Sequence, residues 1–282
     1  MILCDSCGSE IPDTEERCLT CGRYAGPPNV RNAERSEEIQ ALEERYREAY
    51  ERARTKGCLA VLERFDQAVT ASFPVVNVDL RFLHFFVTSE RTLYTNYEVG
   101  VEARSRKPAS LYHDLERRGV AGTLFGSYSS GIVYAALSLD GLGPDSFGPY
   151  AMRLRDIAVR SRVTVLENNS YHFRKKHKIE PGDQPPPGYT ATWDNRHKLA
   201  VAKVVEYITP STAESDFPRL LLSSTGNRAT DEFVEVQIYG TFDLNAVEAV
   251  KGNSKFVSRD DRDLLRMVKA HLKDSGKEWM EQ

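Results

Sequence analysis

Apolar residues in the first quarter of the chain recur at steps of three and four positions. This spacing places side chains along one side of a helix. It occurs twice between residues 32 and 73, so two amphipathic helices are predicted there. The first apolar stripe contains Ile39, Leu42, Tyr46, Ala49 and Ala53, and the second contains Leu59, Val61, Leu62, Phe65 and Val69. Pro74 follows the second stripe and is expected to end that helix.

From residue 75 onward the pattern changes to short runs rich in β-branched and aromatic residues, which are typical of strands. These runs cover residues 75–89, 91–103, 131–139, 148–155, 162–167 and 233–240. Helical periodicity returns at 110–118, 193–208 and 260–273. Because strands and helices do not alternate regularly, we predict an α+β fold with a mixed or antiparallel sheet over residues 75–282.

The N-terminus differs from the rest because cysteines recur in it. Four of the five cysteines form two C-x-x-C pairs, Cys4 with Cys7 and Cys18 with Cys21. Each pair can present two thiolates on one tight turn, and two such turns complete a tetrahedral zinc site. A glycine follows each pair, where a chain that wraps a metal needs positive φ. We therefore predict a zinc ribbon over residues 1–25.

The zinc ion is expected to be structural. Ten residues separate the two pairs, too few to bury a hydrophobic core, so the metal must stabilise the ribbon. Four thiolates also fill the coordination shell and leave no position for a reactive water. Gly26, Pro27 and Pro28 follow the ribbon and indicate a linker to the helices of residues 32–73.

Composition narrows the class of protein. Hydrophobic residues make up 40% of the 282 residues and charged residues 28%, so a buried core is expected. The formal net charge of −3 gives no overall attraction to nucleic acid or membranes. The sequence shows no apolar run of membrane-spanning length and no signal-peptide pattern, so we expect a cytoplasmic protein without a membrane partner. P-loop, Rossmann, H-E-x-x-H and G-x-S-x-G motifs are absent.

Several segments between residues 80 and 250 follow an order found in one enzyme group. They read FGSYSS (125–130), YAALSL (134–139), SFGPYAMRLR (146–155), RVTVLENNS (162–170) and FVEVQIYG (233–240). In this order they resemble the ADP-ribosyltransferase superfamily, especially its diverged bacterial toxin branches, including the DarT-like enzymes that modify DNA. The resemblance implies that residues 75–282 adopt the ADP-ribosyltransferase fold and use NAD as substrate.

The resemblance also implies roles for individual residues. The catalytic residues would be Glu235, Gln237, Ser129 and Tyr134. The residues that contact NAD would include Tyr128, Ser130 and one of Arg81, His84 and Arg91. ADP-ribose would pass to a nucleic-acid or protein acceptor, or NAD would be hydrolysed, as in a toxin or defence effector. The loop of residues 223–231 would take the place of the substrate-recognition loop.

Glu235 has a chemical case of its own. Cleavage of the N-glycosidic bond of NAD passes through an oxocarbenium-like state, which a carboxylate beside the ribose stabilises. Glu235 lies between Val234 and Val236, so its side chain shares a strand face with Gln237. We expect it to face a wet cleft. The alternative is a solvated glutamate on an edge strand.

A second function fits the same sequence. In this interpretation the chain is a non-enzymatic binding module. The zinc ribbon and the basic run of residues 174–178 (RKKHK) would contact nucleic acid or protein. An NAD site requires Glu235, residues 126–134 and one early arginine or histidine to meet around one cleft, whereas a binding module requires no such convergence.

Overall fold

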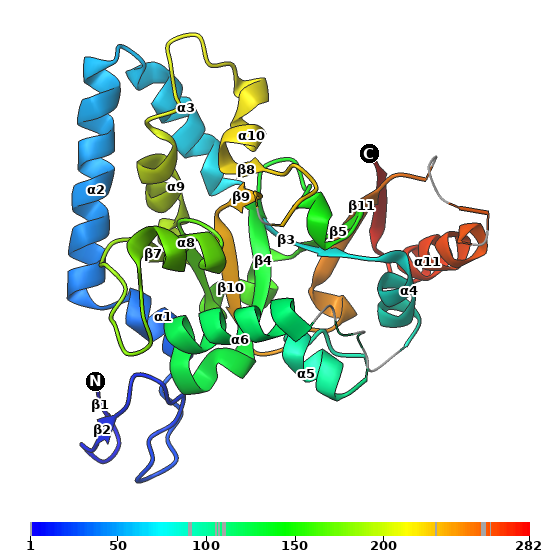
Figure 1. Cartoon of the computed structure of the whole chain (residues 1–282), viewed down its shortest axis with the longest axis horizontal. Helices are drawn as coiled ribbons and strands as arrows, with labels where there is room; N and C mark the ends of the chain where they lie inside the picture. Colours follow the sequence, from blue (N-terminus) through cyan, green and yellow to red (C-terminus); the bar gives the residue numbers. More distant parts are fainter. Residues whose placement is uncertain are drawn as a thin grey trace.

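An eight-stranded mixed sheet runs through the middle of the molecule (Figure 1). The computed structural model describes residues 2–89, 92–104, 106, 108, 111–228, 230–254, 258–259 and 261–282. The strand order is β12-β11-β5-β3-β4-β10-β6-β7. All pairs are antiparallel except β11 with β12. The predicted α+β class with a mixed sheet is therefore confirmed.

The strands of this sheet are short, and two strand pairs lie outside it. Its strands are β3 (Phe73–Val78), β4 (Ile132–Ser138), β5 (Tyr150–Leu154), β6 (Val163–Leu166), β7 (Thr190–Thr192), β10 (Glu235–Tyr239), β11 (Val247–Gly252) and β12 (Glu278–Glu281). The separate pairs are β1 (Ile2–Leu3) with β2 (Glu10–Ile11), and β8 (Leu222–Ser223) with β9 (Glu232–Phe233).

The helices surround the sheet. They are α1 (Pro28–Ala33), α2 (Ser36–Thr55), α3 (Leu59–Thr70), α4 (Leu80–Thr88), α5 (Tyr97–Glu102), α6 (Leu111–Phe125), α7 (Asp156–Val159), α8 (Ser170–His177), α9 (Arg196–Val204), α10 (Phe217–Leu221) and α11 (Arg262–Asp274). A 3-10 helix, η1, spans Gly126–Gly131. The longest described helix, α2, is strongly charged, and none of the described helices could span a bilayer.

The two helices predicted for residues 32–73 are present as α2 and α3. The predicted stripe of α2 buries Leu42, Ala49 and Ala53, although Ile39 is largely exposed. These helices and the sheet share one hydrophobic core. The helix α3 already ends at Thr70, and Pro74 lies inside β3, so the expectation that Pro74 ends this helix was wrong.

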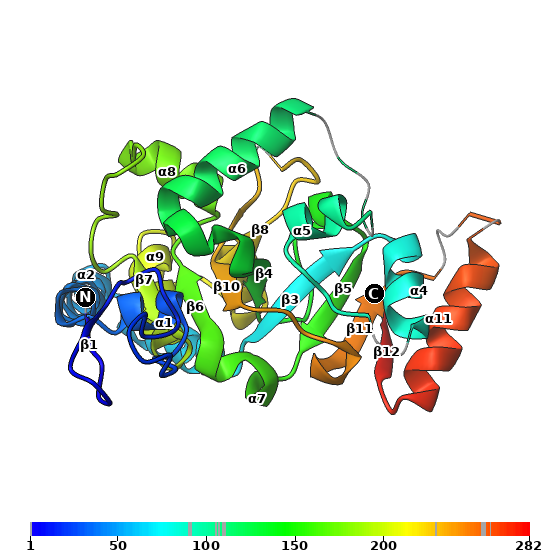
Figure 2. The same cartoon turned by 90° about the horizontal axis from the view of Figure 1, so that it is seen from below.

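The two faces of the sheet have different characters. On one face Val234, just before β10, and Val236 and Ile238 of β10 join the main core, which α2, α3 and α9 cover. Alternate residues of a strand point to opposite faces, so Glu235 and Gln237 lie on the other face. There α6 and α8 cover the sheet (Figure 2). This second face carries the buried polar strand residues.

Two of the predicted strands are largely helical. The run 75–89 forms β3 only up to Val78. The carboxylate of Asp79 then accepts a hydrogen bond from the Phe82 amide at 2.8 Å and caps α4. In the described part of 91–103, Tyr94 forms one bridge with Phe242, and α5 follows. The strand predictions there were wrong because short runs rich in apolar residues fit a helix as well as a strand, and the side chains of Asp79 and Asn96 cap the two helices.

The connection before β5 requires glycine at position 148. Gly148 has φ +139°, and a Cβ there would lie 2.3 Å from the backbone carbon and oxygen of Val78. Gly148→Ala should therefore lower the free energy of unfolding by about 3 kcal/mol or more, because strain and overlap add. Gly182→Ala, also at positive φ but with no atom within 4 Å, is the control and should cost about 1 kcal/mol. Urea unfolding compares them, and equal losses would contradict the proposed overlap.

Candidate metal centre and buried carboxylate site

The two C-x-x-C pairs form matching turns. The amide of Gly8 donates to the carbonyl of Cys4, and that of Gly22 donates to the carbonyl of Cys18, both at 2.8 Å. The two glycines have φ of +72° and +73°. The predicted positive φ after each pair is therefore confirmed, and each turn presents two sulfur atoms to the other.

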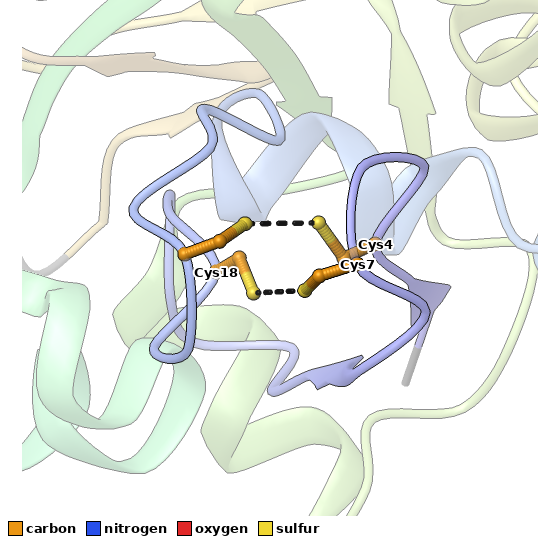
Figure 3. Close-up of side chains that lie close together, drawn as sticks. Cys4, Cys7 and Cys18 are labelled. Atoms are coloured by element: carbon orange, nitrogen blue, oxygen red, sulfur yellow. Dashed lines mark hydrogen bonds between the residues drawn. The ribbon is translucent and has the colours of Figure 1, made fainter.

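The four sulfur atoms form a compact cluster. Those of Cys4, Cys7, Cys18 and Cys21 all lie within 4.8 Å of one another. Between the turns, Cys4 lies 3.6 Å from Cys21 and Cys7 lies 3.6 Å from Cys18 (Figure 3). Tetrahedral coordination with metal–sulfur bonds of about 2.3 Å separates the ligands by roughly 3.8 Å, so this arrangement could hold a metal ion. In the part of the chain that the structure describes, no other group of histidine, cysteine or carboxylate ligands is of this kind.

Little else holds the ribbon together. Its hydrophobic cluster consists of Cys4, Ile11 and Cys18, with Ala25 packed against it. Hydrogen bonds from Ser9 lower the pKa of the Cys7 thiol to about 6, which favours the thiolate form that binds metals. Apart from this small cluster and the turns, a metal ion held by the four sulfur atoms would be the main source of stability for residues 1–25.

Glu235 lies in the interior and not in a wet cleft. Its strand, β10, is flanked by β4 and β6, so it is not an edge strand, and only 5% of the residue is exposed. One carboxylate oxygen accepts a hydrogen bond from the Ser170 amide at 3.0 Å. The other accepts from Gln237 Nε2 at 3.0 Å and from the Ser170 hydroxyl. The expected cleft and the alternative of a solvated edge position are both wrong.

The partner Ser170 places the carboxylate at the start of α8. Asn169 is the N-cap of this helix, and its side chain accepts from the His172 amide at 3.0 Å. The unpaired amides of a first helical turn stabilise a negative charge. Burial nevertheless raises the pKa of Glu235, and the hydrogen bonds from Ser170 and Gln237 only partly oppose this. The negative charge of Glu235 is thus stabilised by only a few hydrogen-bond donors.

The polar cluster extends along the sheet. The Thr164 hydroxyl on β6 donates to Gln237 Oε1 at 3.2 Å. Asn29 Nδ2, on α1, donates to Thr164 Oγ1 at 3.2 Å and to the Gln237 carbonyl at 3.1 Å. Nothing in the sequence singled out Asn29, because its importance comes from contacts with residues more than 130 positions away. Ser170 belonged to a segment of the resemblance, but no role was predicted for it.

Tyr134 joins this cluster, whereas the neighbouring candidates do not. Tyr134 on β4 pairs directly with Gln237. Burial, and then the charge of Glu235, raise its pKa well above the ordinary value. Tyr128, Ser129 and Ser130 lie in η1, beside the opposite end of β10, roughly 13 Å along the strand from Glu235. There the Tyr128 hydroxyl accepts from Asn32 Nδ2 at 3.3 Å.

The early candidates for NAD contact also lie elsewhere. Arg81 and His84 are on α4, which packs against α11 beyond the β11 end of the sheet, away from β10 and β6 (Figure 2). The structure therefore does not bring them to Glu235. Arg91 lies outside the described residues.

Two other arginines lie near the cluster. The guanidinium of Arg117 on α6 stacks over the Tyr97 ring at 3.9 Å and acts electrostatically on Tyr134. Arg228 stacks over Phe147 at 4.8 Å, and burial and then Arg117 lower its pKa. Among the described residues, neither arginine forms an ion pair with a carboxylate. The two positive charges therefore act on each other, and a bound anion would offset this repulsion.

Comparison with known proteins assigns no family to these residues. Neither a scan against protein-family models nor a search of curated proteins finds a match for this chain. The likeness to ADP-ribosyltransferases therefore stays a resemblance of particular segments. The functional meaning of the polar cluster must come from its chemistry.

Burial of Glu235 predicts a pH dependence of stability. Because its folded pKa is raised, the unfolded chain releases this proton at lower pH than the folded chain does. The wild type should therefore lose stability as pH rises from the ordinary glutamate value, about 4.3, through the folded pKa. Glu235→Gln removes this loss, so its stability relative to wild type should increase with pH.

Urea unfolding from pH 4 to pH 8 measures the difference between the two proteins. Glu232→Gln, at an exposed position on the neighbouring β9, is the matched control and should stay parallel to wild type. A Glu235→Gln protein that loses stability relative to wild type as pH rises would contradict the raised pKa.

Proposed function

We propose that this protein is an NAD-dependent ADP-ribosyltransferase or NAD glycohydrolase that uses Glu235, with a structural zinc ion in its N-terminal ribbon. The observation that carries the proposal is the buried carboxylate of Glu235 on the polar face of the sheet, with Gln237 and Tyr134 beside it. A charged group in the interior is expensive, and such groups concentrate at functional sites.

The chemistry follows from the carboxylate. When the bond between the nicotinamide nitrogen and ribose C1′ breaks, its electron pair leaves with nicotinamide, and positive charge develops on the ribose. Glu235 stabilises that charge and accepts a hydrogen bond from a ribose hydroxyl, more strongly in a site of low dielectric than in water. Ser170 and Gln237 hold the carboxylate in place. The acceptor, or water, then bonds to C1′ and gives up its proton to the Glu235 carboxylate.

The arginines complete the substrate site in place of the early candidates. NAD carries a diphosphate, and a planar guanidinium binds phosphate oxygens through paired hydrogen bonds. Arg117 acts electrostatically on both Arg228 and Tyr134. An anion between them would relieve their mutual repulsion. They support the proposal as the diphosphate-binding residues.

Zinc is the metal that best suits the ribbon. Four thiolates at tetrahedral spacing are ligands that zinc accepts without redox chemistry. Cys4, Cys7, Cys18 and Cys21 would hold it, and the closed shell makes the ion structural. NAD is a substrate and not a resident cofactor in this proposal.

The biological setting we propose is a cytoplasmic toxin or defence effector that modifies nucleic acid or protein. The competing function is a non-enzymatic binding module, which does not require the convergence on Glu235 that Arg81 and His84 fail to make. In its basic run Arg174 pairs with Glu180 and Lys176 pairs with Glu167, at 3.5 and 3.3 Å. These pairs reduce the net charge that the run offers to phosphates.

Freshly purified, reduced protein should carry about one equivalent of zinc, because four thiolates close the site. Cys7→Ser should lose most of it. Cys58→Ser is the control and should keep its zinc, because Cys58 is buried in the main core apart from the cluster. Metal analysis by mass spectrometry tests this. Zinc-free wild type, or equal zinc in both variants, would refute the assignment.

Glu235→Gln should abolish NAD consumption, by a factor on the order of 10² to 10³ or more, because the charge that stabilises the oxocarbenium-like state is lost. Nicotinamide release, with label transfer to protein, DNA and RNA, measures the activity. Glu232→Gln should stay near wild type. If Glu235→Gln turned over NAD as fast as wild type, Glu235 would not be the catalytic carboxylate. If wild type neither bound nor consumed NAD, the binding-module function would be favoured.

A further inference from the structure

The ribbon docks onto the main domain through α1. Arg31 of this helix donates from Nη2 to the backbone carbonyl oxygens of Pro12, Asp13 and Glu15, the first at 3.1 Å. All three carbonyls belong to the segment between the two C-x-x-C pairs. Arg35, just before α2, forms an ion pair with Asp13. The ribbon is therefore held by groups of the main domain.

Two positions earlier, α1 joins the buried polar cluster. Asn29 is 3% exposed and donates to Thr164 Oγ1 and to the Gln237 carbonyl, at 3.2 and 3.1 Å. Gln237 in turn donates to the Glu235 carboxylate at 3.0 Å. A continuous path thus runs from the ribbon backbone through Arg31 and Asn29 to Gln237 and Glu235.

A second contact reaches the same strand directly. Tyr239 is the last residue of β10, and its side chain lies close enough to Glu16 of the ribbon for the two to interact. Arg162 Nη1 donates to the Tyr239 carbonyl at 2.7 Å. The end of β10 opposite Glu235 is therefore held by Arg162 and lies beside the ribbon.

The docking depends on the ribbon staying folded. The Arg31 side chain is partly enclosed, and its Nε and Nη1 atoms have no hydrogen-bond partner among the described residues. If the ribbon unfolded, the carbonyl acceptors of Nη2 would also be lost, and α1 would lose its hydrogen bonds to the ribbon. Because metal supplies most of the ribbon's stability, metal loss would free α1 to move.

We infer that metal bound by the four cysteines positions the buried carboxylate: the folded ribbon holds α1, and Asn29 of α1 holds the Gln237–Glu235–Ser170 cluster. Asn29 is in these terms a positioning residue, and the ribbon is an integral support of the site. The coupling stands on the contacts above. Only its effect on catalysis rests on the proposed function.

Hydrogen–deuterium exchange of the full chain, with and without a zinc chelator, tests the coupling. Chelation should raise exchange in residues 1–35. It should also raise exchange in β10 and at the Ser170 amide, on the order of tenfold, as for the loss of about one hydrogen bond. Peptides of α11, at the other end of the sheet, are the internal control and should not change.

Two variants of α1 separate coupling from general loosening. In Asn29→Ala, chelation should still loosen the ribbon, but the added response of β10 and Ser170 should be lost. Asn32 lies on the same helix as Asn29, and Asn32→Ala removes its hydrogen bond to Tyr128 of η1. This variant should keep the full response to chelation. If Asn29→Ala fails to fold, Arg31→Ala provides the same comparison from the ribbon side.

The inference is overturned if chelation raises exchange only within residues 1–25, or if Asn29→Ala responds as wild type does. Nicotinamide release measured on the same samples is a separate readout. Turnover without exchange coupling would refute the inference and leave the proposed function standing. If exchange coupling were seen but metal-loaded wild type did not turn over NAD, the inference would stand and the proposed function would be refuted.

Discussion

A carboxylate in the interior of the sheet is the constraint on which this side of the molecule depends. The Glu235 oxygens are satisfied by the amide and hydroxyl of Ser170 and by the amide group of Gln237. Loss of any of these donors would leave charge in a medium that solvates it poorly. Each of three elements supplies or orients one of these donors. The positions of α8, β10 and α1 must therefore be mutually compatible.

This constraint explains why the two faces of the sheet are built differently. The face toward α2, α3 and α9 is a continuous apolar core, which supplies stability without demanding one arrangement of hydrogen bonds. The opposite face is covered by smaller apolar clusters and a polar network. A rigid apolar layer thus supports a polar layer whose groups are held by directional contacts, an arrangement suited to chemistry.

Local patterns predicted much of the fold, and long-range contacts account for what they missed. The helical stripe of α2, the alternation of β10 and the turn glycines Gly8 and Gly22 are encoded within a few neighbouring residues. The helix α4 was mistaken for a strand because its apolar run has no period that excludes either form. Part of the candidate site could be predicted, because Glu235, Gln237 and Tyr134 lie on two strands that pair directly. Asn29, Arg117 and Arg228 could not be found, because only the tertiary fold brings α1, α6 and the loop after β8 to that strand.

The way the ribbon is seated also bears on how its sequence can vary. Arg31 binds carbonyl oxygens of Pro12, Asp13 and Glu15, so much of the docking depends on the path of the backbone and little on which side chains stand there. The outward surface of the ribbon, where Leu19 is 72% exposed, is not constrained by this contact. Across related chains the cysteines and Arg31 would then be retained while the ribbon's outer residues vary.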